Sequence, residues 1–240
     1  MKELIRTAVM VSLIAAASLA AFGQIAQSST PREDRLLNGL RLLVWSDARS
    51  PKVTVKTRIH SGAAFDPLGK EGTMKLLSDI IFPGGTTRDY FRDDLGGDLK
   101  VTCTHDYIEI DASGDADKFL QIVETLSQAL TNPLIDKETT GRVKSPQLQL
   151  LAGLEKDPKY VANAAAAKRL FGSYPYGRPL QGTTESVSAI DFADVLFAKQ
   201  RFFTADNATI AIVGNVKSDF AFRVVKRLFG GWLKADKKIP

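Results

Sequence analysis

Apolar and polar positions alternate with a period of two in one N-terminal stretch of the chain. From residue 52 to residue 60, the apolar side chains of Val53, Val55 and Ile59 fall on one side and basic side chains fall on the other. This alternation is typical of a strand with one buried face. Because a second short apolar segment, residues 41–45, precedes it, the sequence predicts a hairpin of two antiparallel strands.

The other elements are predicted from the same periodicities. A second hairpin is expected from residues 99–104 and 107–112, a short buried strand from residues 209–214, and helices over residues 73–81, 115–130, 158–171, 191–203 and 219–229. Long helices that alternate with antiparallel hairpins favour an α+β fold. We therefore expect an antiparallel sheet with helices packed on one face, built from two βα-type repeats.

Capping residues mark the boundaries of two of these helices. Asp157 followed by Pro158 is a start signal for the alanine-rich helix, and Gly172 is a stop signal. Ser188 and Asp191 form a capping-box-like arrangement that is expected to open the next helix.

Residues 1–23 have the features of a secretory signal peptide. Lys2 and Arg6 form a basic start, residues 7–21 form an apolar run rich in small residues, and a small-x-small site ends at Gly23. An uncleaved membrane anchor is the alternative, although the run is shorter than the roughly 20 residues that cross a bilayer. We expect cleavage, no stable membrane span afterwards, and export to the periplasm or beyond the cell.

Composition and charge exclude several classes of protein. The chain has 240 residues, of which 44% are hydrophobic and 25% charged, so it can bury a core without disulfides. We expect a flexible lead-in over residues 24–36 and a single domain over residues 37–240. The net charge of +5 is dispersed, with only a short basic tail at residues 234–238, so nucleic-acid binding is not indicated.

Cysteine and histidine are scarce, with one Cys and two His, and form no recognisable site. Cys103 is the only cysteine and lies two positions from His105. A thiol protease needs an orienting group and an oxyanion loop as well, and neither is recognisable near this pair. The other histidine, His60, ends an alternating strand and is expected to be a solvated strand residue. No metal cluster is predicted from these residues.

Five segments, in order along the chain, resemble the signatures of one peptidase family. They are residues 37–41, 60–64, 95–99, 170–183 and 207–216, and the fourth is the most recognisable. The resemblance is to the insulinase/pitrilysin family of zinc metallopeptidases, which are inverzincins and include the mitochondrial processing peptidases. It implies that the domain over residues 37–240 is the N-terminal-type half of a two-halved chamber and ends at the linker to a second half.

The helix that carries zinc in this family resembles residues 72–85, but its catalytic positions are replaced. In the H-x-x-E-H pattern, two His side chains four apart bind the metal and the Glu activates its water. Lys75, Ser78 and Asp79 occupy those positions. A protonated Lys has no lone pair for a metal, and Ser cannot act as a carboxylate base at neutral pH. Lys75 and Asp79 are either an ion pair on one helix face or two separate solvated residues.

The third zinc ligand of the active members is a distal Glu on the helix that leads into the fourth segment. By resemblance this position falls on Leu150 or its neighbour Gln149, and plain counting gives Glu155 as the alternative. Zinc is expected for the family, but its ligands are missing here. We therefore expect no metal, no cofactor and no peptidase activity.

The resemblance also implies a surface that binds extended peptides. In the family, substrates add as a strand to a sheet edge beside the zinc helix, and residues 96–104 match that edge. The candidate residues are Gly96, Gly97, Asp98, Leu99, Lys100, Val101 and Thr102.

Three functional hypotheses follow from this resemblance. The first is an exported, non-catalytic subunit or half-chamber that binds peptides and pairs with an active homologue or a second half-domain. The second is a stand-alone peptide-binding or scaffold module. The third is an active metalloendopeptidase, or an enzyme with an unrecognised site.

Overall fold

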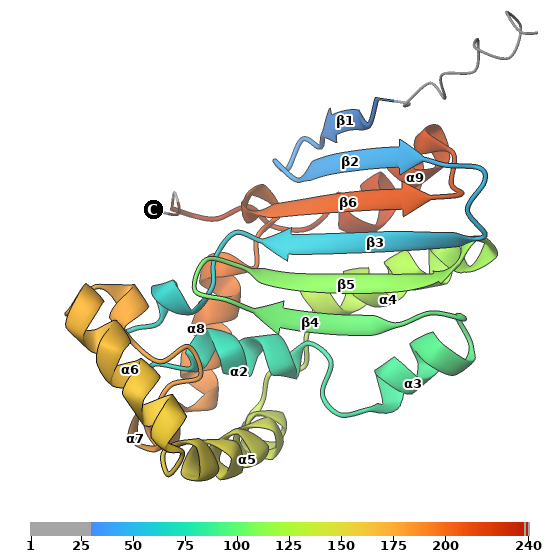
Figure 1. The fold of residues 1–240 in the computed structure, drawn as a ribbon. Coiled ribbons are helices and arrows are strands. Elements are labelled where there is room, and N and C mark those ends of the chain that lie inside the picture. Colours follow the sequence, from blue (N-terminus) through green and yellow to red (C-terminus); the bar gives the residue numbers. More distant parts are fainter. Residues whose placement is uncertain (1–29, 238, 240) are drawn as a thin grey trace, which may run out of the picture. The chain divides into compact units, whose positions relative to one another are not determined.

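A six-stranded mixed sheet forms the centre of the computed structural model, which describes residues 30–237 and 239 (Figure 1). The strands are β1 (Arg32–Arg35), β2 (Arg41–Ser46), β3 (Lys52–Ile59), β4 (Leu99–Cys103), β5 (Ile108–Asp115) and β6 (Ala208–Gly214), in the spatial order β1-β2-β6-β3-β5-β4. Neighbouring strands are antiparallel except β2 and β6, which are parallel. The predicted α+β fold is confirmed, whereas the predicted signal peptide, residues 1–23, lies outside the described residues.

The first predicted hairpin is wrong, because β6 lies between β2 and β3. Val213 of β6 is opposite Trp45 on one side and Thr54 on the other. Strands that follow each other in sequence often pair, but β6 is apolar at almost every position, which is typical of a strand buried between two neighbours. The second hairpin is confirmed, since β4 and β5 pair directly.

The edge strand β1 replaces part of the expected flexible lead-in. Residues 32–35 pair antiparallel with β2, and Arg32 forms ion pairs with Asp34 and Asp219. Charged side chains are common on exposed edge strands. The four residues are all charged, so they show no apolar alternation from which the strand could be predicted.

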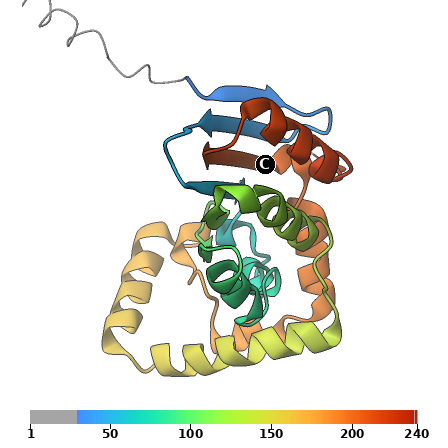
Figure 2. The same cartoon turned by 90° about the vertical axis from the view of Figure 1, so that its right-hand side faces the viewer.

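Helices cover one face of the sheet and continue beyond the β4 edge. They are α2 (Thr73–Ile80), α3 (Thr86–Asp93), α4 (Phe119–Thr131), α5 (Lys137–Leu154), α6 (Pro158–Phe171), α7 (Thr184–Ala189), α8 (Phe192–Phe202) and α9 (Ser218–Phe229), with short 3-10 helices η1 (Ala63–Phe65), η2 (Ala116–Lys118), η3 (Pro175–Gly177) and η4 (Ala205–Asn207). Figure 2 shows α4, in green, and α9, in red, on the same side of the sheet. Within the described residues, no helix is long and apolar enough to cross a membrane.

The predicted helices are all present, and two others have no counterpart in the prediction. These two are α3 and α7, while α5 was expected only from the family resemblance. The boundary signals at Asp157 and Gly172 are confirmed for α6. The capping box of α8 is formed by Asp191 and Asp194, so the expected role of Ser188 is wrong because this residue lies inside α7.

The two faces of the sheet differ as the alternation predicts. Val53 and Ile59 are buried against the helices. On the opposite face, Lys56 forms ion pairs with Glu109 and Asp111 of β5. The core therefore lies between the sheet and the helices, and the second face of the sheet carries paired charges.

Asp66 fixes the N-terminus of α2, the helix that resembles the zinc helix. Its carboxylate accepts hydrogen bonds from the backbone N–H groups of Gly72 at 2.7 Å and Met74 at 2.8 Å, and the residue is only 5% exposed. Burial is the largest effect and raises the pKa of Asp66 to about 7, while the two N–H bonds act in the opposite direction. A single buried carboxyl group therefore ties α2 to the loop before it.

We expect Asp66 to make the fold less stable as the pH rises from about 4 to about 7. The carboxyl group has a pKa of about 7 in the folded state and an ordinary value of 3.8 in the unfolded chain. In this window the folded state holds a proton that the unfolded chain has released, so the free energy of unfolding falls by at most about 1.4 kcal/mol per pH unit. Asp66→Asn should remove this component.

Urea unfolding of the wild type and Asp66→Asn at several pH values in this window measures the difference between the two slopes. Asp117→Asn is the matched control, because it makes the same change of side chain at an exposed position of η2. If the wild type instead gained stability with pH relative to Asp66→Asn, the backbone N–H bonds would outweigh burial.

Candidate functional site

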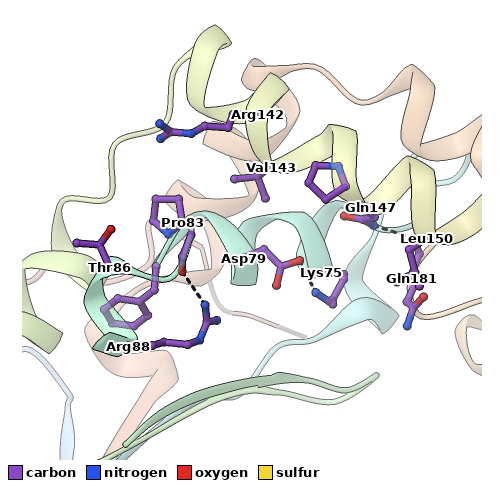
Figure 3. Close-up of a pocket in the computed structure, with 13 residues that line it drawn as sticks. Lys75, Asp79, Pro83, Thr86, Arg88, Arg142, Val143, Gln147, Leu150 and Gln181 are labelled. Carbon is purple, nitrogen blue, oxygen red and sulfur yellow. Dashed lines mark hydrogen bonds and ion pairs between the residues drawn. The ribbon is translucent and has the colours of Figure 1, made fainter. Parts of the chain in front are cut away.

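Helix α2 presents Lys75 and Asp79 together on the side that faces α5 (Figure 3). The two side chains form an ion pair across one helical turn, and both are partly buried. Of the two alternatives from the sequence, the ion pair is the one observed. Because a partly exposed pair of this spacing contributes only ~0.2–1 kcal/mol, its main effect is to neutralise the two charges locally.

Ser78, at the position that the resemblance gives to the catalytic Glu, lies on the buried side of α2. Its hydroxyl group donates a hydrogen bond to the Lys75 carbonyl at 2.7 Å, and the residue is 2% exposed. The hydroxyl is therefore engaged with the helix backbone. It is not among the residues that line the cavity beside the ion pair.

Leu150 of α5, one of the residues that the resemblance gives for the distal ligand position, lines the same cavity as the ion pair. Gln149 is exposed and does not line this cavity. The alternative, Glu155, is used elsewhere: its carboxylate accepts hydrogen bonds from the backbone N–H and the hydroxyl group of Thr184, each at 2.8 Å. Glu155 thus satisfies an open donor in the first turn of α7.

These side chains do not fit the zinc ion that the resemblance implies. An ammonium and a carboxylate are already paired with each other, and the third position is an alkyl side chain. Zinc sites of this kind use neutral imidazoles and a free carboxylate as ligands. Within residues 30–237 and 239, no group of three or more His, Cys, Asp or Glu side chains is arranged to hold a metal ion.

The ion pair forms part of the wall of a cavity of about 560 Å³ lined by α2, α3, α5 and the loops beside them. Sequence reasoning missed four of the polar lining residues, Arg88, Arg142, Gln147 and Gln181. Gln147 donates a hydrogen bond from Nε2 to the Gln181 carbonyl at 2.8 Å, which ties α5 to the segment before α7. The repeat of Val143, Gln147 and Leu150 at helical spacing was the available signal for this face of α5.

Among the described residues, no strand pairs with the outer edge of β4. Ser113 donates its N–H to the Asp98 carbonyl at 2.8 Å, which identifies Asp98 as a residue whose backbone faces β5. Hydrogen-bonded and non-hydrogen-bonded pairs alternate along an antiparallel ladder. The N–H and C=O groups of Leu99, Val101 and Cys103 therefore point away from β5, and β4 is the last strand on that side of the sheet.

Two of the predicted edge residues, Gly96 and Gly97, belong to the turn that leads into β4. Gly96 has φ +65°, and its carbonyl accepts a hydrogen bond from Lys52 Nζ at 2.5 Å. A Cβ atom at Gly97 would lie 2.0 Å from the Ser113 carbonyl oxygen. The glycines thus allow a close turn, while Leu99 to Thr102 lie in the strand itself.

Cys103 and His105 each have surroundings unlike those of a catalytic dyad. Burial raises the pKa of the Cys103 thiol to about 12, which disfavours the nucleophilic thiolate. The His105 ring stacks on Tyr176 and its Nε2 is 3.2 Å from the Arg178 carbonyl. Smaller effects on this pKa come from the charges of Lys75 and Asp79, which lie on α2, a helix that contacts β4.

The other histidine, His60, is exposed at the end of β3, as predicted. Its Nε2 is 2.9 Å from the Thr209 hydroxyl group.

The late signature of the sequence packs against the loop that precedes α2. Gly182 has φ +77°, and a Cβ atom there would lie 2.1 Å from the Glu71 carbonyl oxygen. The Ser186 hydroxyl group donates to the same carbonyl at 2.8 Å, and Arg178 donates to the Asp66 carbonyl at 2.9 Å. The segment that is easiest to recognise in the sequence thus holds α2 in place.

We expect Gly182→Ala to lower the free energy of unfolding by more than about 2 kcal/mol, because the left-handed φ and the close carbonyl both oppose a Cβ atom. Urea unfolding measures the change. Gly141→Ala in α5 is the matched control, since a Cβ there meets nothing within 4 Å. It should be neutral or stabilise by up to about 1 kcal/mol. Similar results for the two variants would contradict the proposed contact.

Comparisons with known proteins agree with this architecture. A family model described as insulinase (peptidase family M16) matches residues 41–184. A probable mitochondrial-processing peptidase subunit beta from Arabidopsis thaliana is 26% identical over 217 residues, which cover 88% of this chain and 41% of that protein. The chain spans half or less of the length of the first curated relatives that it matches.

Two solved structures have the same fold. The periplasmic protease PqqL from Escherichia coli superposes with a TM-score of 0.76 at 18% identity, covering 90% of this chain and 26% of that chain. A peptidase M16 inactive domain from Pseudomonas fluorescens superposes with a TM-score of 0.78 at 19% identity, covering 88% of this chain and 53% of that chain. At these identities the likeness shows the fold alone.

Proposed function

Because the chain belongs to the insulinase family, peptidase family M16, we propose that it is a non-catalytic member that binds extended peptides together with a partner half-domain. The observation that carries this proposal is the Lys75–Asp79 ion pair, at the two positions that the resemblance gives to zinc ligands, on a helix that contacts the edge strand β4. The Pseudomonas fluorescens neighbour, described as an inactive domain, supports the idea that the fold occurs without activity.

The loss of catalysis follows from the chemistry of the replaced positions. Metal-assisted hydrolysis needs an ion with an open coordination position and a base that activates its water. Here Lys75 brings a positive charge to the ligand position, and the Ser78 hydroxyl group is bound to the helix backbone. Leu150 offers no donor atom in place of the distal Glu.

Peptide binding rests on the open edge of β4. The outward N–H and C=O groups of Leu99, Val101 and Cys103 can pair with an extended peptide, which would then form a seventh strand of the sheet. Side chains of such a peptide would alternate between the open face of the sheet and the helical layer that contains the ion pair. Neither the backbone pairing nor the placement of the peptide side chains requires a metal ion.

A partner is proposed from the surface of α6 and the segment that follows it. No residue of α6 is buried, and Leu170, Phe171 and Tyr174 are large, exposed and close in sequence. Clustered exposed apolar side chains mark interaction surfaces. A second half-domain, in the same or another chain, would cover them; the Arabidopsis thaliana relative is itself named a subunit.

Export is proposed from the signal-like features of residues 1–23. The periplasmic location in the description of the Escherichia coli neighbour supports this proposal.

We expect the purified chain to hold no stoichiometric zinc after dialysis and to cleave no unfolded peptide. Restoring Lys75→His, Ser78→Glu and Asp79→His together should give weak zinc binding only, because the third ligand is still missing. Adding Leu150→Glu should tighten zinc binding by at least about tenfold if α5 supplies that position. Metal analysis and peptide cleavage with and without a chelator measure both properties. One tightly bound zinc per wild-type chain, or chelator-sensitive cleavage, would overturn the non-catalytic proposal.

We expect Val101→Pro to weaken the binding of an extended, fluorescently labelled peptide by about tenfold or more. Proline removes an N–H that points away from β5, and a strand tolerates proline when that N–H faces outwards. Val101→Thr is the matched control, because it keeps the N–H and the β-branched shape. Fluorescence anisotropy measures affinity and circular dichroism checks the fold. Equal affinities for the folded proline variant and the wild type would rule out strand addition at β4.

A further inference from the structure

The cavity beside the ion pair carries an excess of positive charge. Its lining contains three basic side chains, Lys75, Arg88 and Arg142, and one carboxylate, that of Asp79. Asp79 is paired with Lys75. The charges of the two arginines are therefore not balanced by an acidic residue of the lining.

Both arginines have guanidinium N–H groups that form no hydrogen bond with the residues that the structure describes. Arg88 donates to the Gly84 carbonyl at 2.7 Å, a neutral acceptor that leaves the charge of the guanidinium uncompensated. Arg142 forms no hydrogen bond or ion pair with any residue that the structure describes. Asp136, the N-cap of α5, has its pKa lowered mainly by the Thr139 N–H and to a smaller extent by Arg142, but it does not line the cavity.

The shape and the apolar lining suit an acidic side chain better than a free small ion. Arg142 of α5 and Arg88 of α3 both line the cavity, and Figure 3 shows them on different helices. Pro83, Val143 and Leu150 add apolar surface for a methylene stem. A guanidinium matches a carboxylate through paired N–H···O bonds, whereas a Lys side chain in the ligand would meet like charge.

The cavity lies within reach of a peptide that adds to β4. Helices α2 and α3, which carry part of its wall, both contact β4, and the ion pair acts on Cys103 at the end of that strand. Every second side chain of an added strand points toward the helical layer. We infer that the cavity is a subsite that takes a Glu or Asp side chain of the bound peptide, with Arg88 and Arg142 as the binding residues. This inference rests on the proposed peptide binding at β4.

Three labelled peptides with one extended sequence and Glu, Gln or Lys at a single central position test the inference on the full chain. The Glu peptide should bind about tenfold more tightly than the Gln peptide at low salt, and the Lys peptide most weakly. The preference for Glu should shrink as salt is added. Arg142→Ala and Arg88→Ala should each reduce the preference, and the double variant should abolish it.

Arg223→Ala is the matched control, because Arg223 is an exposed arginine of α9, which does not line the cavity. It should leave the preference unchanged. Equal binding of the three peptides, still sensitive to Val101→Pro, would overturn the acidic subsite and leave the proposed peptide binding intact. A Glu preference that survives the double arginine variant would also overturn it. Failure of all three peptides to bind would overturn both proposals.

Discussion

The position of α2 depends on hydrogen bonds to backbone groups at its start, because the helix itself is too short to be stable alone. It has eight residues, and isolated helices shorter than about 12 residues are marginal in water. Asp66 satisfies two of its open N–H groups, and Leu76 and Leu77 bury its inner face. The loop before it is held in turn by Ser186 and by the close approach of Gly182. The position of α2 therefore determines where the ion pair lies, which residues form this wall of the cavity, and how far both are from β4.

Helix α2 packs into the core on one side and carries an ion pair on another. Most of the buried residues of α2 are apolar, and Asp66 accepts a hydrogen bond from the backbone N–H at the start of the helix. The side that faces α5 carries the Lys75–Asp79 ion pair, at positions that the resemblance gives to metal ligands. Because such a partly exposed pair contributes little to stability, substitution of these two residues should cost the fold little.

Sequence reasoning predicted the features that leave a local pattern. The alternation around Val53 and the capping signals of α6 gave correct elements, and a helix is present over residues 73–80, as predicted. The insertion of β6 between β2 and β3 was missed, because strand order depends on contacts far apart in sequence. Arg88 and Arg142 were missed for a similar reason. They lie on different helices, and only the fold brings them to one cavity.

The central place of β6 also sets an order of events during synthesis. Within the sheet, β1 and β2 are connected to β3, β5 and β4 only through this strand, which ends at Gly214 near the C-terminal end of the described chain. Until it emerges, the nascent polypeptide holds two separate sheet fragments, each with an open edge. Such intermediates aggregate readily, and pairing across so long a stretch of sequence is slow. Of the described strands, the last to be synthesised is thus the one that joins the two fragments into a single sheet.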